Sequence, residues 1–318
     1  MRVTGDDRPQ ASPSLTPVRV VLDYSPTLSD AGALVYLASN RGVELLAVAL
    51  PGTGESDCDV GVRTTRSLLT IAGRPNVPVG CGPNAPLVGH RDWPDAWRAE
   101  VNCWGDQVLQ PVDARPALDT ETLLVDPLTH ASTLVTIVAV APLTNQGVVL
   151  PAHPEFADTV DRIVIMGGAV AVPGNVEASP NAEWNIYIDP EPARRVIATG
   201  IPITLVPLDA TNNVPWTERL RRRLSTPEAP AATTVHQMAA SRTTLTGFYL
   251  LDELAAVHVS ATNGRHDRAT NRTNRRRRRS RHQPERRDDQ RRGRRRAKIG
   301  NGGVPTHTQR AHLPPSCP

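Results

Sequence analysis

Short runs of valine, isoleucine and leucine, separated by stretches with helical periodicity, limit the fold of this chain more than any other feature. The clearest runs are Val18–Asp23 (VRVVLD), Val43–Leu50 (VELLAVAL) and Leu134–Ala141 (LVTIVAVA). Strands that are apolar on both faces are typical of parallel sheets, because helices then cover both sides. The sequence therefore predicts an α/β fold with an open, mostly parallel sheet flanked by helices.

The remaining elements follow from the same patterns. A helix is predicted to begin at Asp189-Pro190-Glu191, because aspartate caps helices, proline suits the first position and glutamate favours the positive end of the dipole. Further strands are predicted at Val77–Gly80, Ile163–Met166 and Ile201–Leu208, and further helices at Asp30–Asn40, Asp59–Ala72 and Ala117–Ala131.

Charge divides the chain into two unlike parts. Residues 1–264 contain 18 Arg against 28 Asp and Glu, a net charge of −10, whereas residues 265–318 contain 18 Lys and Arg against 4 acidic residues, a net charge of +14. The second part has too few apolar side chains to form a core. We expect a flexible leader at 1–17, one α/β domain at 18–262 and a disordered arginine-rich tail at 263–318.

Three hypotheses account for the tail. A basic arm would bind nucleic acid, because arginine neutralises phosphates and releases counterions, although no aromatic residues are interleaved for base stacking. A nuclear-type targeting patch is the second hypothesis. The third, which we prefer, is a frameshift: the chain has 35 Arg and a single Lys, which suggests a GC-rich gene, and such a gene read out of frame yields aperiodic arginine and proline.

Cysteine usage and hydropathy indicate the cellular compartment in which such a chain is expected. The longest apolar stretch, about ten residues around Leu134–Leu143, is too short to cross a bilayer, so no membrane partner is expected. Residues 1–17 lack the apolar core of a signal peptide. These features predict a soluble, cytoplasmic protein with reduced cysteines. Its four cysteines, which show no CxxC spacing, are Cys58, Cys81, Cys103 and Cys317.

Several motifs lie where the predicted strands end, which is the edge at which open parallel sheets bind ligands. The most specific is Met166–Val196, which reads MGG, then PGN, then AEWN, then DP. Ala141–Asn145 reads APLTN and Leu251–Ala255 reads LDELA. In these motifs the chain resembles the nucleoside hydrolase family of inosine- and uridine-preferring type, whose corresponding runs are MGG, PGN, AE-aromatic-N, DP, PLTN and DPLA. The resemblance covers roughly Val18–Ala261.

The resemblance implies an enzyme that hydrolyses the N-glycosidic bond of ribonucleosides to free base and ribose, using a water bound to Ca²⁺. It also implies a homo-oligomer. Calcium prefers six to eight oxygen ligands, which carboxylates and carbonyls supply. The implied metal ligands are Asp23, Asp30, Thr144 through its carbonyl, and Asp252; the implied substrate-binding residues are Ser29, Met166, Asn175, Glu183, Trp184 and Asn185.

The first loop departs from the family pattern DxDPGxDD. It reads Asp23-Tyr-Ser25-Pro26-Thr-Leu-Ser29-Asp30. The resemblance thus places serine at the family's general base, which is also a metal ligand (Ser25), and at a ribose-binding carboxylate (Ser29). A serine hydroxyl is far too weakly basic near pH 7 to replace a carboxylate. Glu55, in GTGES, is a candidate for a relocated base, with an ordinary turn carboxylate as the alternative. Some family members have a histidine before the late aspartate to protonate the leaving base; here that residue is Leu251.

Two further functions therefore stay open. The missing carboxylates favour a catalytically impaired homologue that binds a nucleoside or a sugar. The tail, if it is genuine, favours nucleic-acid binding, which would be salt-sensitive and independent of sequence.

Overall fold

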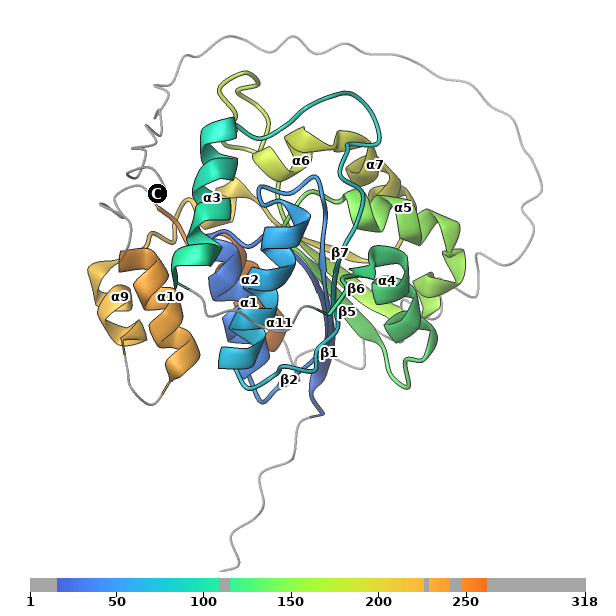
Figure 1. Ribbon diagram of the computed structural model, residues 1–318. Helices are drawn as coiled ribbons and strands as arrows, with labels where there is room; N and C mark the ends of the chain where they lie inside the picture. Colours follow the sequence, from blue (N-terminus) through green and yellow to red (C-terminus); the bar gives the residue numbers. More distant parts are fainter. Residues whose placement is uncertain (1–15, 109–114, 226–228, 241–247, 262–318) are drawn as a thin grey trace, which may run out of the picture. The chain divides into compact units, whose positions relative to one another are not determined.

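The computed structural model describes residues 16–108, 115–225, 229–240 and 248–261 of the 318-residue chain (Figure 1). Within these ranges seven parallel strands form one sheet in the order β4-β3-β2-β1-β5-β6-β7. The predicted fold class is confirmed. The tail at 263–318 lies outside the described residues.

The elements alternate along the chain as βα units. The strands are β1 (Val18–Asp23), β2 (Val43–Leu50), β3 (Val79–Cys81), β4 (Leu118–Asp119), β5 (Val135–Ala139), β6 (Val160–Met166) and β7 (Ile203–Val206). The helices are α1 (Leu28–Ser39), α2 (Cys58–Ile71), α3 (Asp95–Val108), α4 (Thr120–Thr129), α5 (Thr144–Ala152), η1 (Pro154–Asp158, 3₁₀), α6 (Trp184–Ile188), α7 (Pro190–Ala198), α8 (Leu208–Thr211), α9 (Glu218–Leu224), α10 (Pro230–Ala240) and α11 (Asp252–Ala261).

Apolar side chains fill both faces of the sheet, as the strand composition predicts. In β1, Val20 and Leu22 pack on the face covered by α1, α2, α10 and α11, whereas Val21 packs on the face covered by α4, α5 and α7. All three side chains are fully buried. Figure 1 shows α1 and α2 on one side of the strands and α4 and α5 on the other. This double cover holds the central strands rigidly, so that their carboxyl ends form a fixed edge.

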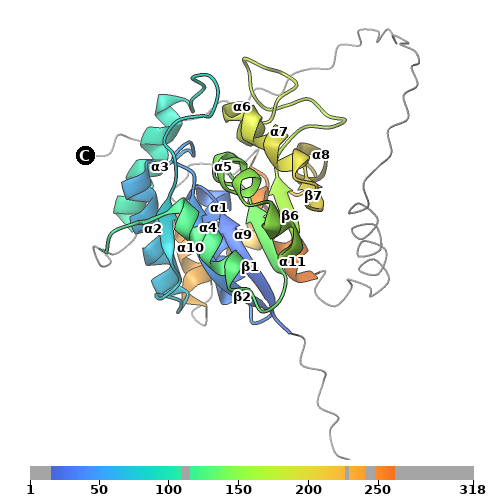
Figure 2. The same ribbon diagram turned by 90° about the vertical axis from the view of Figure 1, so that its right-hand side faces the viewer.

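The strand order reverses beside β1. The chain builds β2, β3 and β4 outward on one side of β1, then returns to place β5, β6 and β7 on the other. Asp23, the last residue of β1, is therefore flanked by Ala49 of β2 and Ala139 of β5. A crevice forms at such a switch point because the connections leave in opposite directions. Figure 2 shows α5, α6 and α7 grouped together, and α7 contacts both of the other two.

Some elements differ from the sequence prediction. Helix α3 was not predicted, and the stretch Ala117–Ala131 divides into β4 and α4. Helix α7 begins as predicted, with Asp189 as the N-cap residue and Pro190 first. The Asp189 carboxylate makes no capping bond, however, since it accepts hydrogen bonds from Leu87 N and Thr144 Oγ1 instead. None of the helices in the described part of the chain has the length and hydropathy to cross a membrane.

The structure joins Cys58 and Cys81 by a disulfide, with their Cα atoms 5.7 Å apart. The expectation of reduced cysteines is therefore wrong for this pair. Their separation of 23 residues carries no motif, but the pairing of β2 with β3 brings the end of β3 beside the start of α2. The bridge ties these two elements together at the carboxyl edge of the sheet.

Candidate functional site

The loop from Asp23 to Asp30 connects β1 to α1 at the carboxyl edge of the sheet, where the strand order reverses. Thr27 caps α1, and its hydroxyl also donates to Asp30 Oδ2 at 2.6 Å. The backbone N–H of Ser25 lies 3.3 Å from Asp30 Oδ1. Both Asp23 and Asp30 are buried, with 0% and 4% of their surfaces exposed. The loop therefore encloses two carboxylates, as the pair of aspartates in its sequence indicates.

Ser25 contacts the loop that follows β2. Its Oγ accepts hydrogen bonds from the backbone N–H groups of Glu55 at 2.9 Å and Ser56 at 3.3 Å. Helix α3 holds the outer side of the same loop, because Arg98 donates to Gly54 O and to Asp57 Oδ1. Glu55 is thus fixed next to the position where the family pattern has its general base.

Four carboxylates influence one another at this edge. Burial raises the pKa of Asp30 well above its ordinary value, and the charges of Asp252 and Glu55 raise it further. Burial likewise raises the pKa of Asp252 to about 7, with Glu183 and Glu55 adding to the rise and the Ser29 hydroxyl opposing it. Carboxyl groups that are costly to ionise together are therefore concentrated where β1, β2 and the start of α11 meet.

Asp23 and Thr144 belong to a neighbouring hydrogen-bond network. Asn145 Nδ2 donates to Asp23 Oδ2 at 2.7 Å, and burial raises the pKa of Asp23 to about 7. Thr144 Oγ1 lies 2.7 Å from Thr53 Oγ1 and donates to Asp189 Oδ2 at 2.9 Å. Asp189 therefore orients the threonine whose carbonyl the resemblance assigns to the metal.

Glu183 organises the segment between β6 and α6. Its carboxylate accepts from the backbone N–H groups of Gly168, Asn185 and Ile186, at 3.0, 2.9 and 3.2 Å. Burial nevertheless raises the pKa of Glu183, because only 3% of its surface is exposed. Its charge also acts on Asp252, so the late aspartate and the AEWN motif share one site.

The polar neighbours of Glu183 are held by the backbone. Asn185 Nδ2 donates to Val140 O and Met166 O, at 3.1 and 3.3 Å. Asn175 Oδ1 accepts from Trp184 N at 3.1 Å. The predicted residues Met166, Asn175, Glu183, Trp184 and Asn185 are thus brought together, as the order of their motifs indicates.

Aromatic side chains gather beside this segment. The rings of Trp93 and Trp184 stack with centroids 5.1 Å apart, and Trp97 lies 5.2 Å from Trp184. Trp93 Nε1 donates to Thr53 O, which links the cluster to the loop after β2. Flat apolar faces of this kind bind planar rings by stacking. The sequence analysis missed Trp93 and Trp97, because isolated tryptophans in an unpredicted helix and loop carry no motif.

Ser29 and Glu253 form a link that the sequence analysis also missed. Ser29 Oγ donates to Glu253 Oε2 at 2.5 Å and accepts from the backbone N–H of Asp252 at 3.0 Å. Glu253 lies in the second position of α11, where the DPLA pattern has proline. The glutamate in place of this proline is the only feature of the sequence that could have indicated a role for Glu253.

The donors for a cation are oxygen atoms only. Among the described residues, no three His, Cys, Asp or Glu side chains gather closely enough to form a metal site by themselves. The buried carboxylates nevertheless match the chemistry of a hard cation. One oxygen, Asp23 Oδ1, has no hydrogen-bond partner in the described residues. The donor chemistry therefore fits Ca²⁺, and the ion itself stays a prediction.

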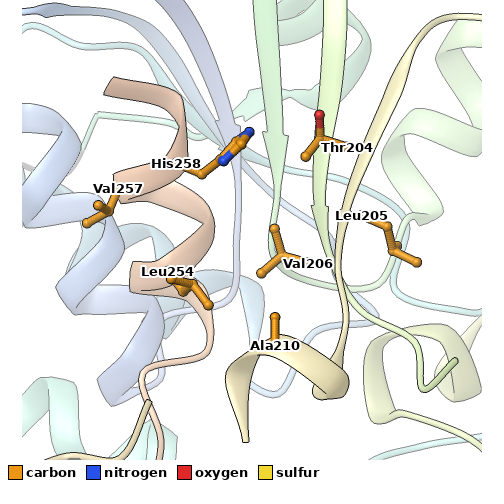
Figure 3. Close-up of a pocket in the computed structure, with 7 residues that line it drawn as sticks. All are labelled: Thr204, Leu205, Val206, Ala210, Leu254, Val257 and His258. Atoms are coloured by element: carbon orange, nitrogen blue, oxygen red, sulfur yellow. The ribbon is translucent and has the colours of Figure 1, made fainter. Parts of the chain in front are cut away.

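A separate pocket lies between β7 and α11 (Figure 3). Its volume is about 320 Å³, its lining is mainly apolar, and no carboxylate contributes to it. It is therefore distinct from the acidic edge described above. Its lining residues are Thr204, Leu205, Val206, Ala210, Leu254, Val257 and His258.

Comparison with protein families gives one match over most of the chain. The family described as inosine-uridine preferring nucleoside hydrolase matches residues 20–299. A pyrimidine-specific ribonucleoside hydrolase, RihA, of Salmonella schwarzengrund (strain CVM19633) is 35% identical over 193 residues, which are 61% of either chain. RihA of Shewanella woodyi (strain ATCC 51908 / MS32) is 33% identical over 213 residues, 67% of either chain. The chain thus spans about three fifths to two thirds of these relatives.

Solved structures agree on the fold. A plant nucleoside hydrolase, the PpNRh1 enzyme, is similar with a TM-score of 0.69 at 26% identity, covering 77% of this chain and 79% of its own. An inosine-uridine preferring nucleoside hydrolase from Bacillus anthracis has a TM-score of 0.63 at 24% identity, covering 76% and 82%.

Proposed function

Because the chain belongs to the inosine-uridine preferring nucleoside hydrolase family, we propose that it hydrolyses the N-glycosidic bond of ribonucleosides to give a free base and ribose. The observation that carries this proposal is the group of carboxyl groups at the switch point, where buried Asp30 and Asp252 both lie within electrostatic reach of Glu55, and Asp252 also within that of Glu183. Concentrated negative charge stabilises the oxocarbenium-like centre that develops as the base leaves.

Ca²⁺ is the cofactor in this proposal, with Asp23, Asp30, Asp252 and the carbonyl oxygen of Thr144 as its protein ligands. The buried Asp23 carboxylate, whose Oδ1 has no hydrogen-bond partner among the described residues, supports the assignment, since a divalent cation offsets the cost of holding it ionised. The ion, when bound, lowers the pKa of a coordinated water so that a neighbouring carboxylate can remove its proton.

Glu55 is the residue that we assign as general base. Its backbone N–H donates to Ser25 Oγ, so it lies next to the serine that replaces the family's base. Its charge raises the pKa values of Asp30 and Asp252, which places its carboxylate within electrostatic reach of both proposed ligands. A carboxylate there can accept a proton from water, which a serine hydroxyl cannot do near pH 7.

The sugar and the base then occupy different parts of the site. Asn175, Glu183 and Asn185 would contact the ribose hydroxyls, with Met166 lining the ring. The nucleobase would lie against Trp184, whose neighbours Trp93 and Trp97 support a stacked arrangement.

Release of reducing sugar tests the proposal. Purified full-length protein is incubated with a panel of purine and pyrimidine ribonucleosides, with added Ca²⁺ and with chelator. Chelator-sensitive release of ribose is the expected result. Folded protein that binds nucleoside or Ca²⁺ but releases no sugar would contradict hydrolysis.

That last outcome would support the second candidate function, a catalytically impaired homologue that binds a nucleoside or sugar. The observation that favours it is the presence of Ser25 and Ser29 at two carboxylate positions. Nucleic-acid binding through the tail is a third candidate, resting on the net charge of +14 at 265–318. Salt-sensitive binding to DNA or RNA that disappears when residues 265–318 are deleted would support it.

A further inference from the structure

The clearest feature that the proposed function leaves unused is the Ser29–Glu253 link. Helix α1 packs along α11, and this link joins the first turn of one to the first turn of the other. The Ser29 hydroxyl bridges two groups of α11, since it donates to Glu253 Oε2 at 2.5 Å and accepts from Asp252 N at 3.0 Å. Asp30 follows Ser29 in the chain and Asp252 precedes Glu253. The link therefore lies between two proposed metal ligands.

Glu253 is seated in a space that the sequence of α1 leaves open. A Cβ atom at Gly32 would lie 2.5 Å from Glu253 Oε1 and 2.9 Å from its Cγ. Oε1 is buried and has no hydrogen-bond partner among the described residues. Glycine inside a helix is less favourable than alanine, so this position carries a conformational cost. Glycine at this position thus keeps room for a carboxyl group between the helices.

Two departures from the family pattern meet at this point. Serine stands at position 29 where the first-loop pattern has aspartate, and glutamate stands at position 253 where the late pattern has proline. Proline has neither a side-chain acceptor nor the length to reach α1. The carboxyl group that α1 lacks at position 29 is therefore supplied by Glu253 of α11. That carboxyl group contacts Ser29, which stands where the family pattern has aspartate.

We propose that Glu253 is a positioning residue of the cation site, which through the Ser29 hydroxyl holds the first turn of α11, and with it Asp252, against Asp30. This inference rests on the proposed function, because it assumes that these two aspartates bind a cation. Groups that orient metal ligands typically change metal affinity by about 10–100-fold when they are removed.

Calcium affinity of the full-length protein, measured by titration calorimetry after chelator treatment, tests the proposal without relying on activity. Glu253→Ala should weaken Ca²⁺ binding by about 10-fold or more. Gly32→Ala should have a similar effect, since its methyl group displaces the Glu253 side chain while leaving the carboxyl group in the protein. Glu253→Gln keeps an oxygen that accepts from Ser29, so its affinity should stay within a few-fold of wild type.

A matched control comes from the same pair of helices. Tyr36 Oη and Ser260 Oγ form a second link between α1 and α11, 2.5 Å long and away from the carboxylates. Tyr36→Phe should leave Ca²⁺ affinity unchanged, whatever it does to the melting temperature. The effects of Ser29→Ala and Glu253→Ala should also not add in the double variant, because Glu253 acts through Ser29.

Two negative results have different meanings. If wild-type protein binds Ca²⁺ and both Glu253→Ala and Gly32→Ala bind it equally well, the positioning role is wrong and the proposed metal site stands. If folded wild-type protein binds no Ca²⁺, the metal assignment fails and the positioning role fails with it. If Tyr36→Phe and Glu253→Ala lost Ca²⁺ affinity equally, the Ser29–Glu253 link would contribute only to the packing of α1 against α11. That result would also overturn the proposal.

Discussion

Individual residues at the carboxyl edge decide whether this member of the family can catalyse hydrolysis. Ser25 and Ser29 each replace a carboxylate, and each hydroxyl is occupied by hydrogen bonds to a neighbouring segment. Ser25 accepts from the loop that carries Glu55, and Ser29 donates to Glu253. Both serines thus have a glutamate beside them, so the carboxyl groups absent from the first loop are present in adjacent elements.

Glu55→Gln tests the assignment of the general base. The amide cannot accept the proton of the attacking water, and the loss of a general base typically lowers kcat by about 10²–10⁴-fold. Substrate affinity should change little, since the substitution is nearly isosteric. The control is Asp57→Asn, two residues on, whose carboxylate is bonded to Arg98 on the exposed side of the loop. Equal kcat values for Glu55→Gln and wild type in steady-state assays would remove Glu55 from the mechanism.

Ser25→Asp should restore a ligand. The N–H groups of Glu55 and Ser56 already point at the Ser25 side chain, and a carboxylate accepts such bonds more strongly than a hydroxyl does. Calcium affinity depends on the number of charged ligands, so we expect it to increase by about 10-fold. The metal-free variant should melt at a lower temperature, because it buries one more carboxylate. Calorimetry with Ca²⁺ checks the first effect and thermal unfolding the second; weaker Ca²⁺ binding would contradict the prediction.

Whole elements were easier to predict than their contacts. The first and last residues of β1 and β2 agree with the sequence prediction. Both segments consist mainly of valine, leucine and alanine, and such short apolar runs favour buried strands. Helix α3 was missed, since its moderate amphipathicity follows a stretch rich in proline and tryptophan. It is the element that fixes the loop of Glu55 through Arg98, so the geometry of that loop was not predictable either.

Motif order indicated which residues lie near one another, but not what each side chain contacts. Glu183 and Asp252 are far apart in sequence, and only the family resemblance predicted that they lie close together. That Glu183 accepts three backbone N–H bonds, and that Asp189 binds Thr144 rather than capping its own helix, depends on tertiary packing. Single-residue patterns carry no information about such long-range partners.

The Cys58–Cys81 bridge links α2 to β3 and closes a loop of 23 residues by sequence separation. Removing a crosslink of this length raises the conformational entropy of the unfolded chain, which corresponds to about 3 kcal/mol. The double variant Cys58→Ser/Cys81→Ser should therefore unfold at a lower urea concentration than wild type under non-reducing conditions. An unchanged midpoint would show that the bridge does not form in solution.

At the scale of the whole molecule, the buried carboxyl groups make stability depend on pH. Burial raises the pKa of Asp23 and of Asp252 from 3.8 to about 7 in the folded, metal-free protein. Between these values the unfolded chain has lost protons that the folded protein retains. The stabilisation is therefore complete below about pH 4 and is lost as the pH rises through about 7. A cation reverses this trend, because it binds the ionised carboxylates and only the folded state assembles them.

The melting temperature of chelator-treated protein should accordingly fall between about pH 5 and about pH 8, and added Ca²⁺ should raise it most at the upper end. Asp252→Asn provides the control, since a neutral amide removes one of the titrating groups and should make the pH profile less steep. It should also reduce the stabilisation by Ca²⁺, because the variant lacks a proposed ligand. Differential scanning fluorimetry over this range measures both effects. A melting temperature that rises with pH in the absence of Ca²⁺ would mean that these carboxyl groups are ionised in the folded protein, and the acidic edge would then need a partner other than a proton or a divalent cation.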